Sequence, residues 1–343
     1  MLRKPLWISL ALASVVAAAP SNAAPQLPQQ NRIVVIDVPS NLGLRPPKPG
    51  VEPGVKHLAS ALRKTGLVEH LGARDAGRVE PPTYSPAPDL ATGFRNGPAM
   101  HSYAEAVAAR LDPLLASGDF VIVLGGDCGI LVGSALALKT RGRYGLAYID
   151  AHDDFSNPRD PGKYRGRFTA GGLALGLATG HGPAALVDIQ GRSPYVRAED
   201  AVQIGLSRTP EDTAYAAIET FERSGIEAIT IDDIEHRGAQ AAGAAARAKL
   251  QNAATKGFWI HLDADVLDAK IMPAVDSPND HGLSFEQLKQ ILAELLSSPK
   301  AAGLEITIFD PDLDPDGTLA KKLAQTIKQA FVESGRLTRN GAK

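Results

Sequence analysis

The sequence predicts an α/β fold in which a mostly parallel sheet is covered by helices on both faces. Short apolar runs alternate with stretches of helical spacing from Arg32 to Glu333. These runs are apolar throughout rather than alternating with polar residues, which is typical of parallel strands buried on both faces. No linker, change of composition or internal repeat interrupts the pattern, so one large α/β domain is the simplest organisation.

The strands are expected where apolar runs stop at a polar residue or a glycine: Arg32–Asp37, Phe120–Leu124, Gly145–Ile149, Ala201–Leu206, Ala228–Ile231, Phe258–Leu262 and Gly303–Ile308. Apolar residues spaced three and four apart predict helices at Val55–Lys64, Met100–Ala116, Ile130–Lys139, Glu211–Arg223, Ala239–Leu250, Phe285–Leu296 and Leu319–Glu333. The Pro- and Gly-rich segment Glu80–Pro98 is expected to be a long loop.

The chain has 343 residues, of which 44% are hydrophobic and 22% charged, a composition that excludes disordered, collagen-like and coiled-coil proteins. Its 36 basic and 38 acidic residues give a net charge of −2, and no basic stripe stands out, which argues against a nucleic-acid-binding protein. Because Cys128 is the only cysteine, the chain has no internal disulfide.

Residues 1–23 are expected to be a secretory signal peptide, and residues 24–343 the single mature domain. Arg3 and Lys4 precede the apolar run Leu6–Ala19, and Pro20–Ala23 then offers small residues for cleavage. The alternative is an uncleaved membrane anchor, but the run is short for a membrane span. We therefore expect a secreted, periplasmic protein with no membrane association once the signal is removed.

Three polar clusters follow three of the expected strands: Gly125–Cys128, Asp150–Asp154 and His261–Asp265. The carboxyl ends of parallel strands meet at one edge of a sheet, so these clusters can form one site. Closely spaced carboxylates repel one another unless a cation lies between them, which predicts a metal site. Carboxylate and imidazole ligands suit Mn and, less specifically, Zn, Fe or Ni.

The spacing of these residues supports two neighbouring metal ions. In an extended segment, alternate residues point the same way, so Asp150, His152 and Asp154 can face one point, and Asp263 and Asp265 can face it from a neighbouring strand. A water held by two cations becomes acidic enough to act as a nucleophile near neutral pH. Each motif alone also fits a turn or cap at a strand end.

Taken in order, the three motifs resemble the signatures of the ureohydrolase family of arginases and agmatinases. They read Gly-Gly-Asp-Cys at 125–128, Asp-Ala-His-Asp-Asp at 150–154 and His-Leu-Asp-Ala-Asp-Val-Leu-Asp at 261–268, and residues 273–284 are similar to the family's next loop. The resemblance runs from Arg32 to the C-terminal helix. It implies an arginase-like three-layer fold with about eight strands, two manganese ions, and a homo-oligomer, either a trimer or a hexamer.

The resemblance also implies a ligand set and a reaction. One metal ion would bind Cys128, Asp150, Asp154 and Asp263, and the other Asp150, His152, Asp263 and Asp265, so that Asp150 and Asp263 bridge the two ions. The implied reaction is attack of metal-bound hydroxide on the guanidino or amidino carbon of a small-molecule substrate, with release of urea and an amine.

Cys128 stands where the family usually has a histidine ligand, which would make this chain a divergent branch. A thiolate is a softer ligand than imidazole, so Zn, Fe, Co or Ni becomes possible in place of Mn. The alternative is that Cys128 is a small buried thiol with no metal.

The family's proton-carrying histidine is missing from Arg167–Gly172. The candidate catalytic residues are therefore Asp154 and His261. His261 lies two residues before Asp263, so its side chain should share the metal-facing side, as a general acid or as a donor behind the ligands. An ordinary hydrogen-bonded histidine is the alternative.

The family's substrate-binding acid, part of a Val-Glu-x-Asn-Pro pattern in the last strand, is replaced by Ile308 in Thr307–Pro311. Glu305 would lie on the opposite face of a regular strand, whereas Asp310 would share the face of Ile308. Asp310 is a candidate substrate contact, with a turn-capping role as its alternative. Two further candidates are Asn157 and His181, and a surface loop is the alternative place for His181.

These departures put arginine in doubt as the substrate, and leave another guanidino, amidino or formimino compound, or an amide. We expect a metal-dependent hydrolase of non-peptide C–N bonds. One alternative is a non-catalytic protein of arginase fold that binds a small cationic ligand outside the cytoplasm. A metallophosphoesterase is disfavoured, because its Gly-Asn-His motif is absent.

Overall fold

The computed structural model describes residues 32–155, 168–208 and 221–337, and these form one compact unit. Its centre is an eight-stranded sheet with the order β2-β1-β3-β8-β7-β4-β5-β6, and every neighbouring pair is parallel. The strands are β1 Ile33–Asp37, β2 Arg74–Arg78, β3 Phe120–Leu124, β4 Tyr144–Ile149, β5 Ala201–Leu206, β6 Glu227–Thr230, β7 Gly257–Asp263 and β8 Ala301–Thr307.

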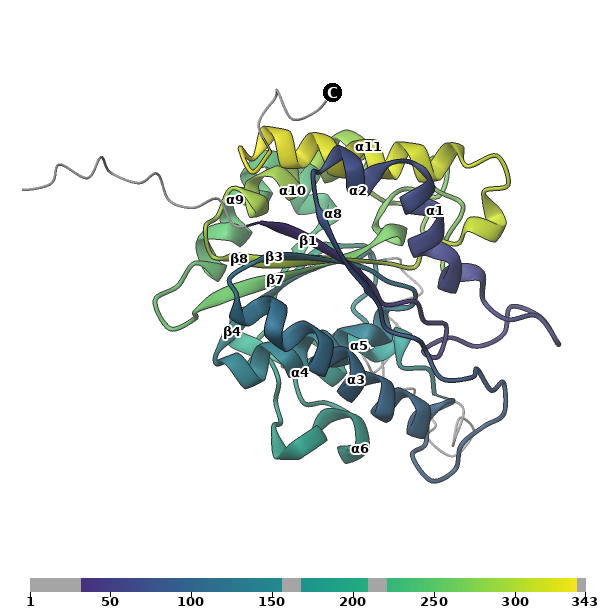
Figure 1. Ribbon diagram of the computed structural model, residues 1–343. Coiled ribbons are helices and arrows are strands. Elements are labelled where there is room, and N and C mark those ends of the chain that lie inside the picture. The colour runs from purple at the N-terminus through teal and green to yellow at the C-terminus, as the bar shows by residue number, and fades with distance from the viewer. Residues whose placement is uncertain (1–31, 156–167, 209–220, 338–343) are drawn as a thin grey trace, which may run out of the picture. The chain divides into compact units, whose positions relative to one another are not determined.

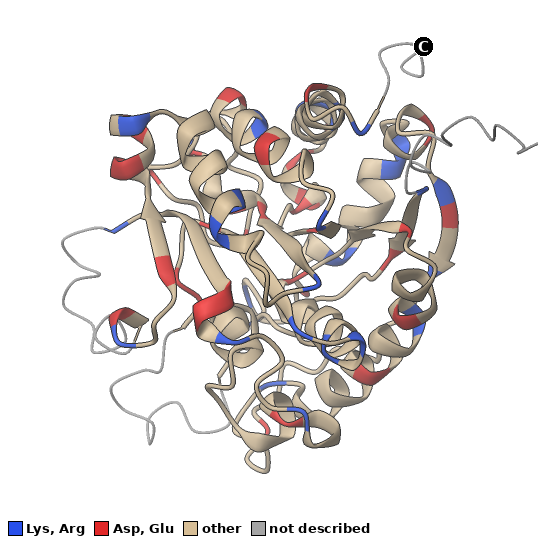
Figure 2. Ribbon diagram, turned by 90° about the vertical axis from the view of Figure 1, so that its left-hand side faces the viewer, with Lys and Arg blue, Asp and Glu red and all other residues tan. Residues whose placement is uncertain are grey.

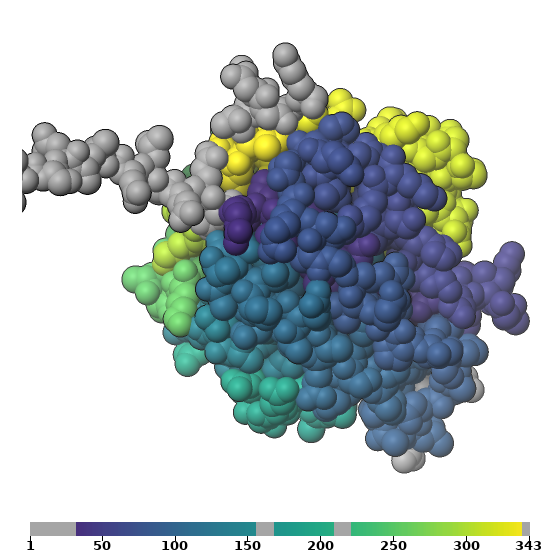
Figure 3. Space-filling view, viewed as in Figure 1, coloured from purple at the N-terminus to yellow at the C-terminus, as the bar shows by residue number. Residues whose placement is uncertain are grey.

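Helices cover both faces of this sheet, which gives three layers (Figure 1). One face carries α3 Gly97–Ala116, α4 Leu131–Arg141, α5 Ala174–Ala178 and α6 Ala184–Val187. The other carries α1 Leu58–Lys64, α2 Leu67–His70, α8 Ile231–Arg237, α9 Ala239–Leu250, α10 Phe285–Leu296 and α11 Thr318–Glu333. In Figure 3 the early helices α1 and α2 lie against the C-terminal α11, so distant parts of the sequence close one surface together.

The central strands β3, β8, β7 and β4 are buried apart from one residue in each of β4 and β8, as their continuous apolar runs predict. All five residues of β3 and all seven of β7 are buried. On the face covered by α11, the rings of Phe331 in α11 and Phe120 in β3 pack nearly perpendicular to each other, with 5.6 Å between centroids. The predicted parallel α/β fold is therefore confirmed, with each of the seven expected strands present within a few residues of its predicted bounds.

The eighth strand, β2, was not predicted because its residues are polar. It pairs only with β1 at the sheet edge, and four of its five residues are exposed. The predicted helix Val55–Lys64 begins as a 3-10 turn, Gly54–His57, before α1 starts at Leu58. Gly54 fits closely against Asp310, since a Cβ there would lie 2.2 Å from its carboxylate oxygen.

Several predictions fall outside the described residues: the signal peptide 1–23, Asn157, and all but the end of the helix expected at Glu211–Arg223. Within the described ranges, no helix is long and apolar enough to cross a membrane. Lys and Arg are interspersed with Asp and Glu over the described elements, as Figure 2 shows.

Candidate metal centre

The carboxyl ends of β3, β4 and β7 share one local structure. In each, an aspartate side chain accepts a hydrogen bond from the backbone N–H two residues later. Asp127 accepts from Gly129 at 2.8 Å, Asp150 from His152 at 2.7 Å, and Asp263 from Asp265 at 2.8 Å. Such turns let the chain leave the sheet sharply. Each turn occupies one carboxylate oxygen, so the turn role and a ligand role are compatible at Asp150 and Asp263.

A row of polar side chains crosses the sheet just before these strand ends. Neighbouring strands place Gln203, Tyr148, His261 and Glu305 side by side in register. The Gln203 amide donates to the backbone oxygens of Asp150 and His152, at 2.8 and 2.9 Å. All four side chains are buried, so the row fixes the loops that carry the site.

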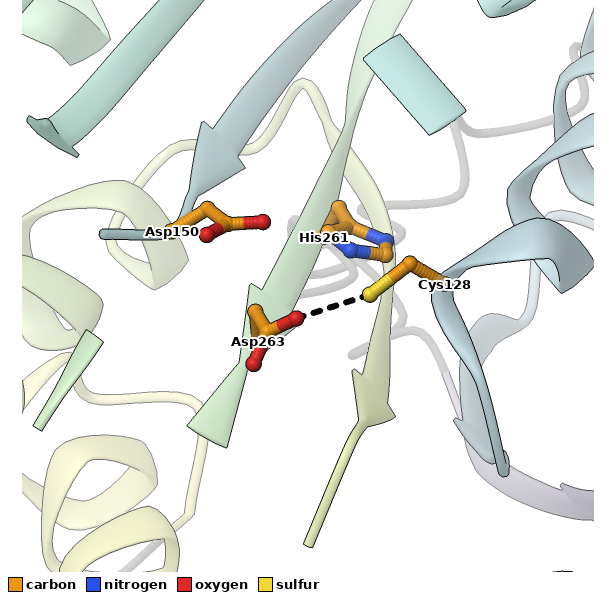
Figure 4. Close-up of side chains that lie close together, drawn as sticks. All are labelled: Cys128, Asp150, His261 and Asp263. Atoms are coloured by element: carbon orange, nitrogen blue, oxygen red, sulfur yellow. Dashed lines mark hydrogen bonds between the residues drawn. The ribbon is translucent and has the colours of Figure 1, made fainter. Parts of the chain in front are cut away.

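The first group of possible ligands consists of Cys128, Asp150, His261 and Asp263, and one ligand atom from each lies within 4.8 Å of the others. Figure 4 shows these four side chains converging from three separate segments of the chain. The Cys128 thiol donates to Asp263 Oδ2 at 2.8 Å and lies 3.2 Å from Thr307 Oγ1. Cys128 is thus oriented toward the carboxylates, in a fully buried position.

The second group consists of Asp150, His152 and Asp265. The Nδ1 atom of His152 lies 3.1 Å from Asp265 Oδ2 and 3.5 Å from Asp150 Oδ1. Asp150 belongs to both groups, so its carboxylate lies where one ligand would bridge two ions. Asp263, the other expected bridge, occurs only in the first group.

Asp154, expected as a ligand of the first ion, lies outside both groups. Its backbone is in the left-handed region with φ 41°, and its carboxylate accepts a hydrogen bond from the Tyr148 hydroxyl. A carboxylate that accepts from a phenol keeps lone pairs for another partner, so the contact positions Asp154 beside the cluster.

The clustered, buried carboxylates of the site favour the binding of a cation. Burial, together with the charges of neighbouring aspartates, raises the pKa of Asp154 and Asp263 well above the ordinary value, and that of Asp265 to about 6. Burial raises the pKa of the Cys128 thiol as well, and the nearby charge of Asp263 raises it in addition. The carboxylate of Asp265 raises the pKa of His152.

Two buried carboxylate oxygens, Asp150 Oδ2 and Asp265 Oδ1, have no hydrogen-bond partner in the part of the chain that the structure describes. Buried acceptors without partners are costly, and divalent cations satisfy them directly. The donor set of carboxylates, imidazole and thiol is one that transition metals accept. The residues present therefore fit a metal centre at this end of the sheet.

Two of the expected substrate-binding residues, Asp310 and His181, lie among the described residues. Asp310 accepts hydrogen bonds from the backbone N–H groups of Asp312 at 2.9 Å and Gly54 at 3.2 Å, so it caps the turn after β8. The ring of His181 packs on Phe155, with 4.6 Å between centroids. Neither residue belongs to the two ligand groups.

The expectation that Ile308 continues the last strand is wrong. The strand ends at Thr307, and Ile308 has a φ of 68°, a rare conformation for a β-branched residue. Regular alternation of side chains therefore stops one residue early, and the faces of Ile308 and Asp310 do not follow from strand geometry. Glu305 does lie in the regular strand, pointing at His261.

Sequence reasoning missed two residues that support the site, Tyr148 and Gln203. Each is a polar side chain inside an otherwise apolar strand, which was the available signal. Tyr148 precedes Asp150 by two residues and so shares its face. The sequence pattern does not show the strand register, and it is the register that brings Tyr148 and Gln203 into one row with His261.

The sequence of this chain is similar to those of known arginases. The model of the Arginase family matches residues 31–332. The arginase of Bacillus caldovelox is 27% identical over 308 residues, which cover 88% of this chain and 98% of that protein. Arginase-1 of Rattus norvegicus is 27% identical over 312 residues, covering 87% and 90% of the two chains.

The fold agrees as well. The solved structure of Bacillus caldovelox arginase superposes with a TM-score of 0.76 at 26% identity, and covers 88% of this chain and 98% of that one. The resemblance predicted from three short motifs is thereby confirmed over nearly the whole described chain. The chain belongs to the arginase family of ureohydrolase-type enzymes.

Proposed function

We propose that the protein hydrolyses a guanidino or amidino compound at a binuclear metal centre, and that a guanidino substrate yields urea and an amine. The observation that carries this proposal is the sharing of Asp150 between two ligand groups, together with the buried oxygens of Asp150 and Asp265 that have no hydrogen-bond partner among the described residues. Two adjacent divalent cations would acidify a water there and stabilise the negative charge that develops in the transition state.

The balance of the reaction requires proton carriers. Water adds its oxygen to the central carbon, the bond from that carbon to the substituted nitrogen breaks, and both water protons leave with the amine, which departs as an ammonium ion. Asp154 is the candidate carrier, because its carboxylate lies beside the cluster and is held by Tyr148. A carboxyl with a raised pKa can hold a proton at the pH at which it must pass it on.

We further propose that arginine is not the preferred substrate. Ile308 is buried, and no carboxylate takes the place of the family's acid at this position. A neutral side chain there removes an ion pair that a cationic group would otherwise gain. Smaller or less charged guanidino, amidino or formimino compounds, or amides, fit such a site better. We also expect manganese to be one of several usable metals, and the protein to form a homo-oligomer.

The test is a turnover screen of metal-free protein reloaded with Mn²⁺, Zn²⁺ or Co²⁺. Urea release reports guanidino substrates, and ammonia release reports formimino compounds and amides. Asp265→Asn should lose turnover, whereas Asp112→Asn, the same change at a half-exposed site where α3 contacts Arg141 of α4, should not. A protein that binds two metal ions but turns over none of these classes would instead be the non-catalytic ligand-binding form of the fold.

A further inference from the structure

Among the histidines of the described chain, His261 is the only one that is buried. It lies in the middle of β7 and is fully buried. Its ring stacks on Tyr148 with 4.4 Å between centroids and 1° between planes. Such stacking and burial fix the plane of the imidazole. The open question is then which of its two nitrogens carries the proton and which has a free lone pair.

The Nδ1 atom is committed to Glu305. It lies 2.7 Å from Glu305 Oε1, and the other oxygen of that carboxylate accepts from Ser134 Oγ at 2.6 Å. Glu305 is fully buried and, when ionised, only accepts hydrogen bonds. Nδ1 therefore carries the ring proton, and in the neutral ring Nε2 keeps a free lone pair.

Among the described residues, the one hydrogen-bonding contact of Nε2 is a long one, to Thr307 Oγ1 at 3.4 Å. That hydroxyl has one hydrogen, and it lies closer to the backbone oxygen of Leu262, at 3.1 Å, and to Cys128 Sγ, at 3.2 Å. The Cys128 thiol in turn donates to Asp263. A buried acceptor thus points at the cluster without a matched donor.

We infer that His261 Nε2 is a metal ligand, and that it supplies the imidazole of the first metal position together with Cys128, Asp150 and Asp263. One ring nitrogen already lies within 4.8 Å of a ligand atom from each of these residues (Figure 4). Cys128, which follows β3, stands where the family usually has a histidine, and His261 brings an imidazole to the same cluster from β7. Glu305 is the residue that orients it.

This arrangement follows a recurring rule of metal sites, in which a ligating histidine donates its other ring N–H to a carboxylate. It also accounts for Glu305, a buried acid that no expected ligand set uses. The four groups supply one sulfur, one nitrogen and two oxygens, which favours Zn²⁺, Fe²⁺ or Co²⁺ over Mn²⁺ at this position. The inference rests on the proposed binuclear centre and refines its composition.

The decisive measurement is NMR of the full chain with ¹⁵N-labelled histidine, titrated with Zn²⁺. The expected result is that the Nε2 signal of His261 moves to the range of metal-bound imidazole, while Nδ1 keeps its proton. His261→Gln assigns the signal, and His152→Gln removes the other site histidine from the spectrum. A structural histidine would not change its Nε2 signal in this way.

Metal stoichiometry after dialysis gives an independent readout. Wild-type protein should retain two Zn²⁺ ions, His261→Gln one, and Glu305→Gln two with about ten- to a hundredfold weaker binding at the first position. His236→Gln, a matched change on the exposed end of α8, should retain two. If the wild type binds two ions with an unshifted Nε2, this inference is wrong but the metal centre stands. If it binds none, the proposed function fails as well.

Discussion

The two carboxylate oxygens of Asp263 have different partners. Oδ1 accepts from the backbone N–H of Asp265, which an asparagine oxygen can still do, whereas Oδ2 faces Cys128 and the cluster. We therefore expect Asp263→Asn to fold but to lose metal and turnover, because one negative charge between the cations is gone. In the metal-free state it should be at least as stable as the wild type, since a repelling buried charge has been removed.

Metal analysis after dialysis and a thermal melt in chelator check both halves of this prediction. Asp112→Asn serves as the matched surface control. An Asp263→Asn protein that retains two metal ions and full turnover would contradict the role of this carboxylate.

Cys128 determines which metal the first position prefers. Burial raises the pKa of its thiol, so metal binding must displace the proton, and affinity should fall as the pH falls. Cys128→Ser replaces a soft ligand by a hard one of similar shape, so the first position should weaken and shift from Zn²⁺ toward Mn²⁺. The group of His152 and Asp265 does not include Cys128 and should remain filled.

This prediction is read from metal content after equilibration with equal concentrations of Mn²⁺ and Zn²⁺. In the Co²⁺ form, a sulfur-to-cobalt charge-transfer band can arise only from Cys128, the single cysteine. The band should be present in the wild type and absent in Cys128→Ser. A wild-type protein without the band would make the thiol a bystander.

The strands and their ends differ in how far the sequence predicts them. Apolar runs such as Phe120–Leu124 define buried strands because burial on both faces demands continuous hydrophobicity. The edge strand Arg74–Arg78 has no such demand and leaves no signal. Side chains stop alternating between the two faces beyond the last hydrogen-bonded residue of a strand. The strand pattern therefore does not hold for Ile308 and Asp310, because β8 ends at Thr307.

The same contrast holds for the site. Motif spacing predicted that Asp150, His152 and Asp263 lie near one another, because residues two apart share a side and parallel strands end together. The pairing of His261 with Glu305 depends on the register of β7 against β8, which local spacing does not contain. The sequence therefore does not predict residues such as Glu305, which lie on one strand and hold a site residue of the next strand in place.

Helix α10 begins with a capping box formed by Ser284 and Gln287. The Ser284 hydroxyl accepts from the N–H of Gln287 at 3.2 Å, and the Gln287 side chain accepts from the N–H of Ser284 at 2.9 Å. Ser284→Ala should lower the free energy of unfolding by about 1 kcal/mol, because it leaves an N–H at the helix start without its partner.

Chemical denaturation of the metal-free protein measures this loss. Ser297→Ala is the matched control, since its hydroxyl only donates back to the oxygen of Glu294 at the other helix end. Metal content should be the same in both variants, because α10 contributes no ligand. Equal stability of the two variants would remove the energetic role assigned to the cap.

At the scale of the whole molecule, the acidic cluster couples metal binding to stability. Its carboxylates lie at the carboxyl edge of a sheet whose faces are both covered by helices, so water does not screen them (Figure 1). Without cations, the folded protein therefore holds protons that the unfolded chain releases. The pH dependence of stability should report this directly.

The sign follows from the raised pKa values. Burial and neighbouring charges raise the pKa of Asp265 to about 6, against about 4 for an unfolded aspartate, and they raise the pKa of Asp154 and Asp263 as well. Between about pH 4 and pH 6 the folded state therefore binds more protons than the unfolded state. The stabilisation from these groups is therefore complete below about pH 4, and is lost as the pH rises through this window.

With metal bound, the sign reverses. The ligands must be deprotonated to bind, so metal affinity and its contribution to stability rise with pH. Melting curves from about pH 5 to pH 8 should therefore diverge, with the cluster destabilising the chelator-treated protein and stabilising the Zn²⁺-saturated protein as the pH rises. Ionisable groups outside the cluster contribute equally to both curves, so the difference between them isolates the site. Asp265→Asn should reduce that difference, and parallel curves for wild-type protein with and without Zn²⁺ would show that these carboxylates do not bind metal in the folded chain.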